Sequence, residues 1–297
     1  MLQILMGALS LGLLWAIITI GVYLTYRILT IADLTVEGSI VMGASIAAFA
    51  ITKGINAYLA ILLAFLGGLS AGLITGLLHT KLKIPSLLAG ILTMIALYSI
   101  NLRIMGRANI SLLRVDTAYT VFEKMGMNHM SSVIVLGLIF VGSITGILYW
   151  FFGTEIGCAI RATGDNPQMA RAQGINTNTT IILGLMISNG LVAIGGALIA
   201  QSQSFADIQM GIGSIVIGLA SVIIGEVLFG KRNFYVRLLS LALGAITYRI
   251  IIAVVLRLGM PANDLKLFTA ITVAVALSLP VFRSYLVPLK KSFRRGE

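Results

Sequence analysis

Residues 131–152 read SSVIVLGLIFVGSITGILYWFF, an apolar run without a charged side chain. A helix of this length is about 30 Å long, which matches the hydrocarbon core of a bilayer. The polar stretch GCAIRATGDNPQMARAQGIN, residues 157–176, follows it, and another apolar run begins at residue 179. This alternation of long apolar runs and short polar breaks predicts a helical protein that crosses a membrane several times.

The composition of the 297-residue chain supports the same fold class. Hydrophobic residues make up 58% of the sequence and charged residues only 10%, against about 25% in a soluble domain. A β-barrel would show strands that alternate apolar and polar residues. The 32 glycines suit helices that pack closely through small side chains. We therefore expect an all-α, polytopic membrane protein in which residues 1–297 form a single transmembrane domain.

The apolar runs predict about eight to ten membrane-spanning helices. Two runs contain a Glu residue and are rich in Gly and Ser, so we expect some helices to be broken or re-entrant, which requires surrounding protein or water. The first run has no basic residue before it and is longer than a signal peptide needs, so we expect it to be retained. The candidate spans are 2–25, 34–52, 57–79, 85–101, 131–152, 179–201, 208–229, 234–258 and 265–282.

Basic side chains predict the orientation. The net charge is +11, and the Lys and Arg residues cluster at the ends of apolar runs, which indicates the positive-inside bias rather than nucleic-acid binding. If the basic tail 283–297 is cytoplasmic, 13 Lys and Arg residues lie inside and 7 outside, with Arg249 left within a span. The N-terminus and the loop 102–130 are then external, and the segment 153–178 is cytoplasmic.

Local signals predict a short helix in the polar stretch. Asn166 is a good N-cap, Pro167 suits the first helical position, and Gly174 suits the residue beyond the end. The helix would be about 10 Å long and too short to span a membrane. We expect Met169 and Ala170 to form a small apolar face on it. A plain surface connector is the alternative.

The spacing in this stretch resembles the cytoplasmic-loop signature of ABC-importer permeases of the branched-chain amino acid and ribose family. The matching pattern reads G-x-A-x-R-A-x-G-x-N-x-x-x-A-R-x-x-G-I-N. In that family the segment is the coupling helix, which docks in a groove of the ATPase subunit. The resemblance thus implies an ATPase-coupling role for Gly157, Arg161, Ala162, Gly164, Asn166, Pro167, Ala170, Arg171, Gly174, Ile175 and Asn176.

Two further segments resemble the same family. Residues 32–48, ADLTVEGSIVMGASIAA, are similar to its D-L-S-V-x-G segment, with Glu37 before Gly38. Residues 211–230 are similar to its Gly-rich run, although Gly225 and Glu226 replace the usual paired glycines. The closest subgroup is that of permeases of lipoprotein-dependent amino acid uptake systems, some of which are associated with aromatic amino acids.

The resemblance implies the permease subunit of an ATP-driven importer of a small solute, expected to be an amino acid, in the bacterial cell membrane. The chain has no GxxxxGK[ST] motif, so ATP and Mg²⁺ would bind to a separate ATPase subunit, and the permease itself would have no cofactor and no enzymatic activity. The other implied partners are an extracytoplasmic binding protein or lipoprotein and a second permease subunit, expected to form a homodimer.

Polar residues within the spans are candidates for the substrate pathway, because a charge at mid-membrane costs from about 3 to more than 10 kcal/mol. Asp33 and Glu37, spaced i, i+4, would share a helix face. A structural alternative pairs Glu226 with Arg249. An ion-coupled secondary transporter would also use intramembrane carboxylates, but it would not explain the coupling signature. The candidates are Asp33, Glu37, Asn101, Glu226 and Arg249, with Asn189, Gln201 and Gln203 as weaker ones.

Overall fold

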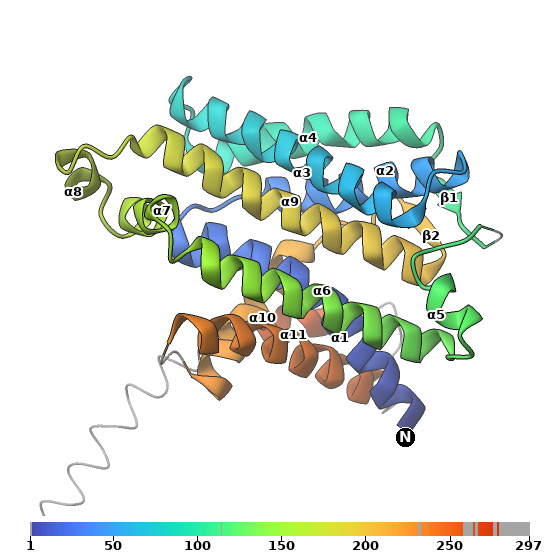
Figure 1. Ribbon diagram of the computed structural model, residues 1–297. Helices are drawn as coiled ribbons and strands as arrows, with labels where there is room; N and C mark the ends of the chain where they lie inside the picture. The colour runs from blue at the N-terminus through green and yellow to red at the C-terminus, as the bar shows by residue number, and fades with distance from the viewer. Residues whose placement is uncertain are drawn as a thin grey trace, which may run out of the picture.

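The computed structural model describes residues 2–113, 115–230, 233–257, 264, 267–275 and 278. Its long helices lie side by side with roughly parallel axes and form a bundle (Figure 1). The predicted cytoplasmic tail 283–297 lies outside the described residues, as do residues 265–266, 276–277 and 279–282 of the predicted last span, 265–282.

Seven of the described helices are long and apolar enough to cross a membrane, and an eighth apolar helix, α10, is shorter. The prediction of an all-α polytopic membrane protein is therefore confirmed. The seven long helices are α1 (Leu2–Tyr23, continued by the π-helical turn η1, Leu24–Ile28), α2 (Thr35–Thr52), α3 (Ala57–Thr80), α4 (Ser86–Met105), α6 (His129–Phe151), α9 (Thr177–Gln203) and α11 (Phe234–Arg257); α10 is Ser214–Phe229.

The short elements gather at the two ends of the bundle. Helices α7 (Glu155–Asp165) and α8 (Pro167–Ala172) lie at one end, and α5 (Thr120–Lys124) lies at the other (Figure 1). An antiparallel two-stranded sheet, β1 (Asn109–Ser111) with β2 (Phe205–Asp207), lies at the same end as α5. The loop 102–130 is therefore partly ordered into secondary structure, and its first residues extend α4.

Helix α9 runs through the middle of the bundle and packs against α1, α2 and α3. Its contact with α3 depends on the absence of side chains at Gly68 and Gly72. A Cβ atom at Gly68 would overlap the carbonyl oxygen of Asn189, and one at Gly72 would overlap that of Leu185. Small residues four apart thus allow two backbones to approach closely, as in other membrane helix pairs.

Two helices begin inside the bundle. Helix α2 follows the non-helical segment 29–34, and its first residues are buried beside Asn189, near the middle of α9. Helix α10 begins at Ser214, after turns that occupy residues 208–213. These are the two spans for which the sequence predicts an interruption. The first turn of each helix has N–H groups without a partner in the helix itself. These groups need partners elsewhere in the protein, because no water is available in the bilayer core.

Candidate functional site

The short helix α8 has the predicted caps. The Asn166 Oδ1 atom accepts the N–H groups of Gln168 and Met169 at 3.1 and 3.0 Å, and Pro167 occupies the first turn. Gly174 has φ +82°, a left-handed conformation that favours glycine. The predicted shape of this helix is confirmed, although it ends one residue earlier, at Ala172.

Helix α7, which precedes α8, was not predicted from the sequence. Its N-cap is Thr154, whose hydroxyl accepts the N–H group of Gly157 at 3.3 Å. Gly164 lies against the end of α1, where a Cβ atom would overlap the carbonyl oxygen of Ile28. The Thr30 hydroxyl lies 3.2 Å from the Gly164 carbonyl oxygen. The glycines of the signature therefore allow α7 to pack directly on the backbone that leads into the segment 29–34.

The structure corrects the expected apolar face of α8. Ala170 is 0% exposed and points into the protein, whereas the neighbouring Met169 is 53% exposed. Arg171 is exposed, and its Nε atom donates to the Thr177 hydroxyl at 2.7 Å. Among the other signature residues, Arg161, Asn166, Pro167, Gly174 and Asn176 are exposed, Ala162 and Ile175 are half-buried, and Gly157 and Gly164 are buried.

A basic cavity of about 650 Å³ lies beside α7, and Arg27, Arg161 and Arg237 line it. Arg27 forms an ion pair with Glu226 at 2.6 Å, so the alternative that pairs Glu226 with Arg249 is wrong. The Glu226 side chain is almost fully buried, while that of Arg27 remains partly exposed. This ion pair joins the π-helical end of α1 to the end of α10.

Asp33 and Glu37 hold the two helix starts inside the bundle. The Asp33 carboxylate accepts the Thr35 N–H group at 2.9 Å and the Asn189 side-chain amide at 2.7 Å. The Glu37 carboxylate accepts the N–H group of Gly213, the residue before α10, at 2.9 Å. Carboxylates at these positions satisfy free N–H groups and complement the helix dipoles.

These contacts change two expectations. Asp33 precedes α2 rather than sharing a helix face with Glu37. Asn189 is more central than expected, because it also accepts the Ser39 hydroxyl at 2.6 Å. Its position could not be derived from the sequence, since Asp33 and Asn189 are 156 residues apart.

Asn101 and Glu37 line one cavity of about 350 Å³, together with Tyr98, Gln209 and Ile212. The Asn101 side chain is buried and donates to the Gly38 carbonyl oxygen at 3.2 Å, while its Oδ1 atom has no hydrogen-bond partner within the described chain. The structure thus brings two of the five pathway candidates together at a cavity that is mainly apolar and is also lined by the Tyr98 ring and Gln209.

Arg249 lies at a different cavity, of about 370 Å³, between α11, α10 and the helical residues 267–275. Its guanidinium carbon lies 4.4 Å from the centre of the Trp15 ring, in a cation–π contact. No ion pair of Arg249 is present among the residues that the structure describes.

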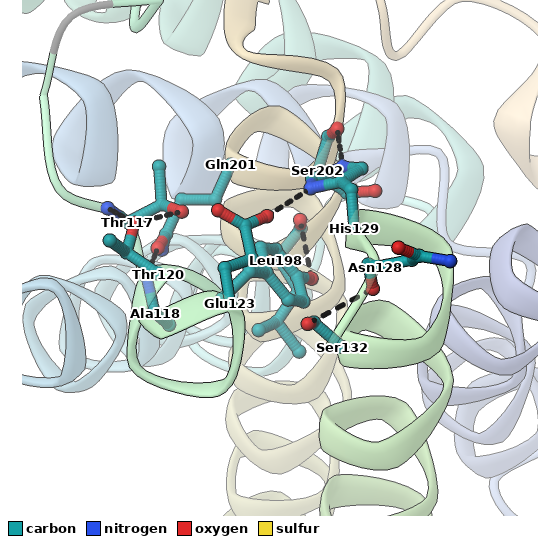
Figure 2. A network of polar contacts seen from close by, with 11 residues as sticks. Thr117, Ala118, Thr120, Glu123, Asn128, His129, Ser132, Leu198, Gln201 and Ser202 are labelled. Carbon is teal, nitrogen blue, oxygen red and sulfur yellow. Dashed lines mark hydrogen bonds and ion pairs between the residues drawn. The ribbon is translucent and has the colours of Figure 1, made fainter. Parts of the chain in front are cut away.

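Hydrogen bonds tie the loop 102–130 to the end of α9 (Figure 2). The His129 ring contacts a Glu123 carboxylate oxygen at 2.6 Å and the Ser202 carbonyl oxygen at 3.0 Å. The Gln201 side-chain oxygen accepts the Ala118 N–H group at 2.9 Å. These contacts give the end of the bundle opposite α7 and α8 a fixed surface.

An apolar helix bundle with interrupted helices, internal cavities and buried polar groups is the architecture of a membrane transport protein. The chain belongs to the family described as the permease component of the branched-chain amino acid transport system, whose model matches residues 4–277. This finding confirms the resemblance read from the sequence. The chain is a multi-pass permease subunit of an ABC importer in the plasma membrane.

Individual relatives agree with this assignment. The chain is 46% identical over 267 residues to the tyrosine transport system permease protein of Clostridioides difficile, covering 90% of this chain and 88% of the relative. It is 34% identical over 281 residues to an uncharacterized protein of Rickettsia prowazekii, covering 93% and 97%. An autoinducer 2 import system permease protein of Salmonella typhimurium is 27% identical over 66% of this chain and 55% of that relative.

A solved structure supports the fold. The chain is similar to a transporter of the metal-chelate ABC type in an inward-facing conformation, with a TM-score of 0.51 and 15% identity, covering 95% of this chain and 85% of the other. At this identity the likeness concerns the arrangement of the helices alone.

Proposed function

We propose that this permease passes an aromatic amino acid, with tyrosine as the first candidate, across the plasma membrane. The observation that carries the proposal is the 46% identity to a tyrosine transport system permease over almost its whole length. The cavity at Glu37 and Asn101 supports it, because its polar groups and the Tyr98 ring match the polar and aromatic parts of such a solute.

The proposal includes a separate ATPase that binds ATP and Mg²⁺, because the sequence has no nucleotide-binding motif of the GxxxxGK[ST] type. Helix α8 presents Met169 at its surface and would enter the groove of the ATPase. Movement of α8 would pass through α7 to Thr30, then along the segment 29–34 to the start of α2. This route connects the end of the bundle to its interior through direct contacts.

Two further partners complete the proposed importer. A binding protein would dock on the fixed surface formed by α5 and the loop 102–130. A second copy of the chain would face the open side of the Asn101 cavity, where Ile95, Tyr98 and Ile212 are exposed apolar or aromatic side chains. The solute would then pass between two permease subunits.

Transport by the complete complex tests this proposal. The permease, its ATPase and the binding lipoprotein would be reconstituted in proteoliposomes, and uptake of labelled L-tyrosine would be measured with and without ATP on the ATPase side. We expect ATP-dependent uptake that persists when proton and sodium gradients are collapsed. Uptake that follows an ion gradient without ATP would instead favour a secondary transporter.

The orientation can be tested with the native cysteine. Cys158 is the only cysteine in the sequence and lies exposed on α7. We expect a membrane-impermeant maleimide to label it in inside-out vesicles but not in intact spheroplasts. Met125→Cys in a Cys158→Ser background is the matched control at the other end, and it should show the reverse pattern. Labelling of both positions from one side would contradict the predicted topology.

The exposed side chain of α8 provides a test of coupling. Met169→Glu should reduce ATP-dependent uptake at least about tenfold, because a new charge would be buried in the ATPase groove at a cost of several kcal/mol. The thermal stability of the permease alone should not change, since Met169 is exposed there. Met169→Leu, which keeps an apolar side chain, is the control and should transport normally. Wild-type uptake by Met169→Glu would exclude this face from coupling.

A further inference from the structure

We propose that Arg249 is a binding residue for the carboxylate group of the transported amino acid, an inference that rests on the proposed function. The supporting features are an arginine with a buried Nε atom and no acidic partner among the described residues, an aromatic ring that fixes its position and an adjoining cavity. Together they form a site for a small anion.

The Arg249 side chain carries a positive charge within a membrane-spanning helix. Arg249 lies well inside α11, and its Nε atom is buried without a hydrogen-bond partner in the described part of the chain. Isolated charges inside a membrane are costly, and they usually pair with each other or serve a substrate or ion pathway. The expected structural pair is absent, because Glu226 binds Arg27 instead.

An aromatic ring fixes the position of the Arg249 guanidinium group. Trp15 of α1 stacks under Arg249, and this cation–π contact compensates only part of the cost of burial. The ring provides no conventional hydrogen-bond acceptor, and the Arg249 Nε atom has none within the described chain. A planar fork of N–H donors matches a carboxylate, which it can bind through two parallel hydrogen bonds.

A cavity adjoins the Arg249 side chain. The cavity of about 370 Å³ next to Arg249 is lined mainly by apolar side chains, such as Val216, Ile217 and Ile252. Ile212 lines both this cavity and the one that contains Glu37 and Asn101. The Arg249 cavity therefore borders the proposed substrate pathway and has a size suited to a small solute.

Trp15 provides a direct measurement of binding at this site. The sequence contains two tryptophans, so Trp150→Phe leaves Trp15 as the single reporter, 4.4 Å from Arg249. The purified full-length permease would be titrated with L-tyrosine, with para-hydroxyphenylpropionate, which keeps the carboxylate, and with tyramine, which lacks it. Excitation at the red edge of tryptophan absorption avoids the signal of the ligands.

We expect the two carboxylates to change Trp15 fluorescence and tyramine to have no effect. Arg249→Gln should weaken the response to both carboxylates at least about tenfold, since hydrogen bonds to a charged group are lost. Arg249→Lys should give an intermediate affinity, because it keeps the charge but not the planar fork. Thr247→Ala, at a half-buried position on the same helix that does not line the Arg249 cavity, should bind like the parent protein.

The three ligands are compared on the protein that keeps Arg249, so the test remains valid even if an Arg249 variant does not fold. Equal responses to tyramine and L-tyrosine, or no response to any of the three compounds, would overturn the assignment of a carboxylate site. If the complex imports tyrosine and Arg249→Gln imports it equally well, the inference fails while the proposed function stands. If the complex does not import tyrosine but the carboxylates still bind through Arg249, the proposed function fails while the assignment of a carboxylate site stands.

Discussion

Gly164→Ala is expected to abolish transport. A single methyl group at this position would overlap the carbonyl oxygen of Ile28, and the neighbouring Leu29 Cα atom is also backbone. No side-chain rotation can relieve such an overlap, so α7 must move away from the end of α1, at a cost of about 1–3 kcal/mol or more. The hydrogen bond from Thr30 to the Gly164 carbonyl oxygen would be lost as well. ATP-dependent uptake and thermal unfolding of the purified complex would measure the effect.

Gly142→Ala and Gly146→Ala are matched controls for this substitution. Both positions lie in helix α6, and an added Cβ atom at either has no neighbour within 4 Å. These variants should fold and transport like the parent, because alanine is also a better helix former than glycine. If Gly164→Ala transports as well as these two variants, close packing of α7 on α1 is not needed for coupling.

Asp33→Ala is expected to cause a large loss of stability. Asp33 is 1% exposed, and its carboxylate accepts hydrogen bonds from Thr35 and Asn189. Hydrogen bonds to a charged group contribute about 1.5–3 kcal/mol each, and both donors would remain buried without this partner. The start of α2 would lose its cap, so thermal unfolding in detergent should shift to a much lower temperature. Asp33→Asn should be milder because it keeps an acceptor for the Thr35 N–H group.

Asp207 offers an unusually close control for Asp33. Its carboxylate also accepts a backbone N–H group two residues later, from Gln209 at 2.7 Å, and the side-chain amide of Asn109 at 3.2 Å. These contacts are exposed at the end of the bundle, where water can replace them. Asp207→Ala should therefore lower the unfolding temperature only slightly. Equal effects of the two substitutions would show that burial does not decide the role of Asp33.

The membrane class, the approximate positions of the eight described apolar helices and the shape of α8 could all be predicted from the sequence. Each depends on interactions between residues that are close along the chain. The bilayer thickness requires about twenty apolar residues per span. The caps of α8 depend on Asn166, Pro167 and Gly174, all within nine residues. The spacing of the coupling signature likewise indicated the family without knowledge of the fold.

Helix α7 could not be predicted from interactions between residues that are close along the chain. Its residues contain two glycines, Gly157 and Gly164, which weaken the helical signal in sequence. Both are buried against backbone carbonyl groups of other segments. The two glycines are explained by tertiary packing, which local helix propensities do not describe.

Which charges meet and which side chains are buried became known from the three-dimensional arrangement of the helices. Arg27 and Glu226 are 199 residues apart, and Asp33 and Asn189 are 156 apart. Such pairs depend on how each helix is rotated and which helices are neighbours, and a nearly uniformly apolar helix encodes little of this in its pattern. Ala170 is buried and Arg249 lacks an acidic partner among the described residues for the same reason. In the membrane, close packing through small residues fixes these rotations, because the lipid tails are as apolar as the helices themselves.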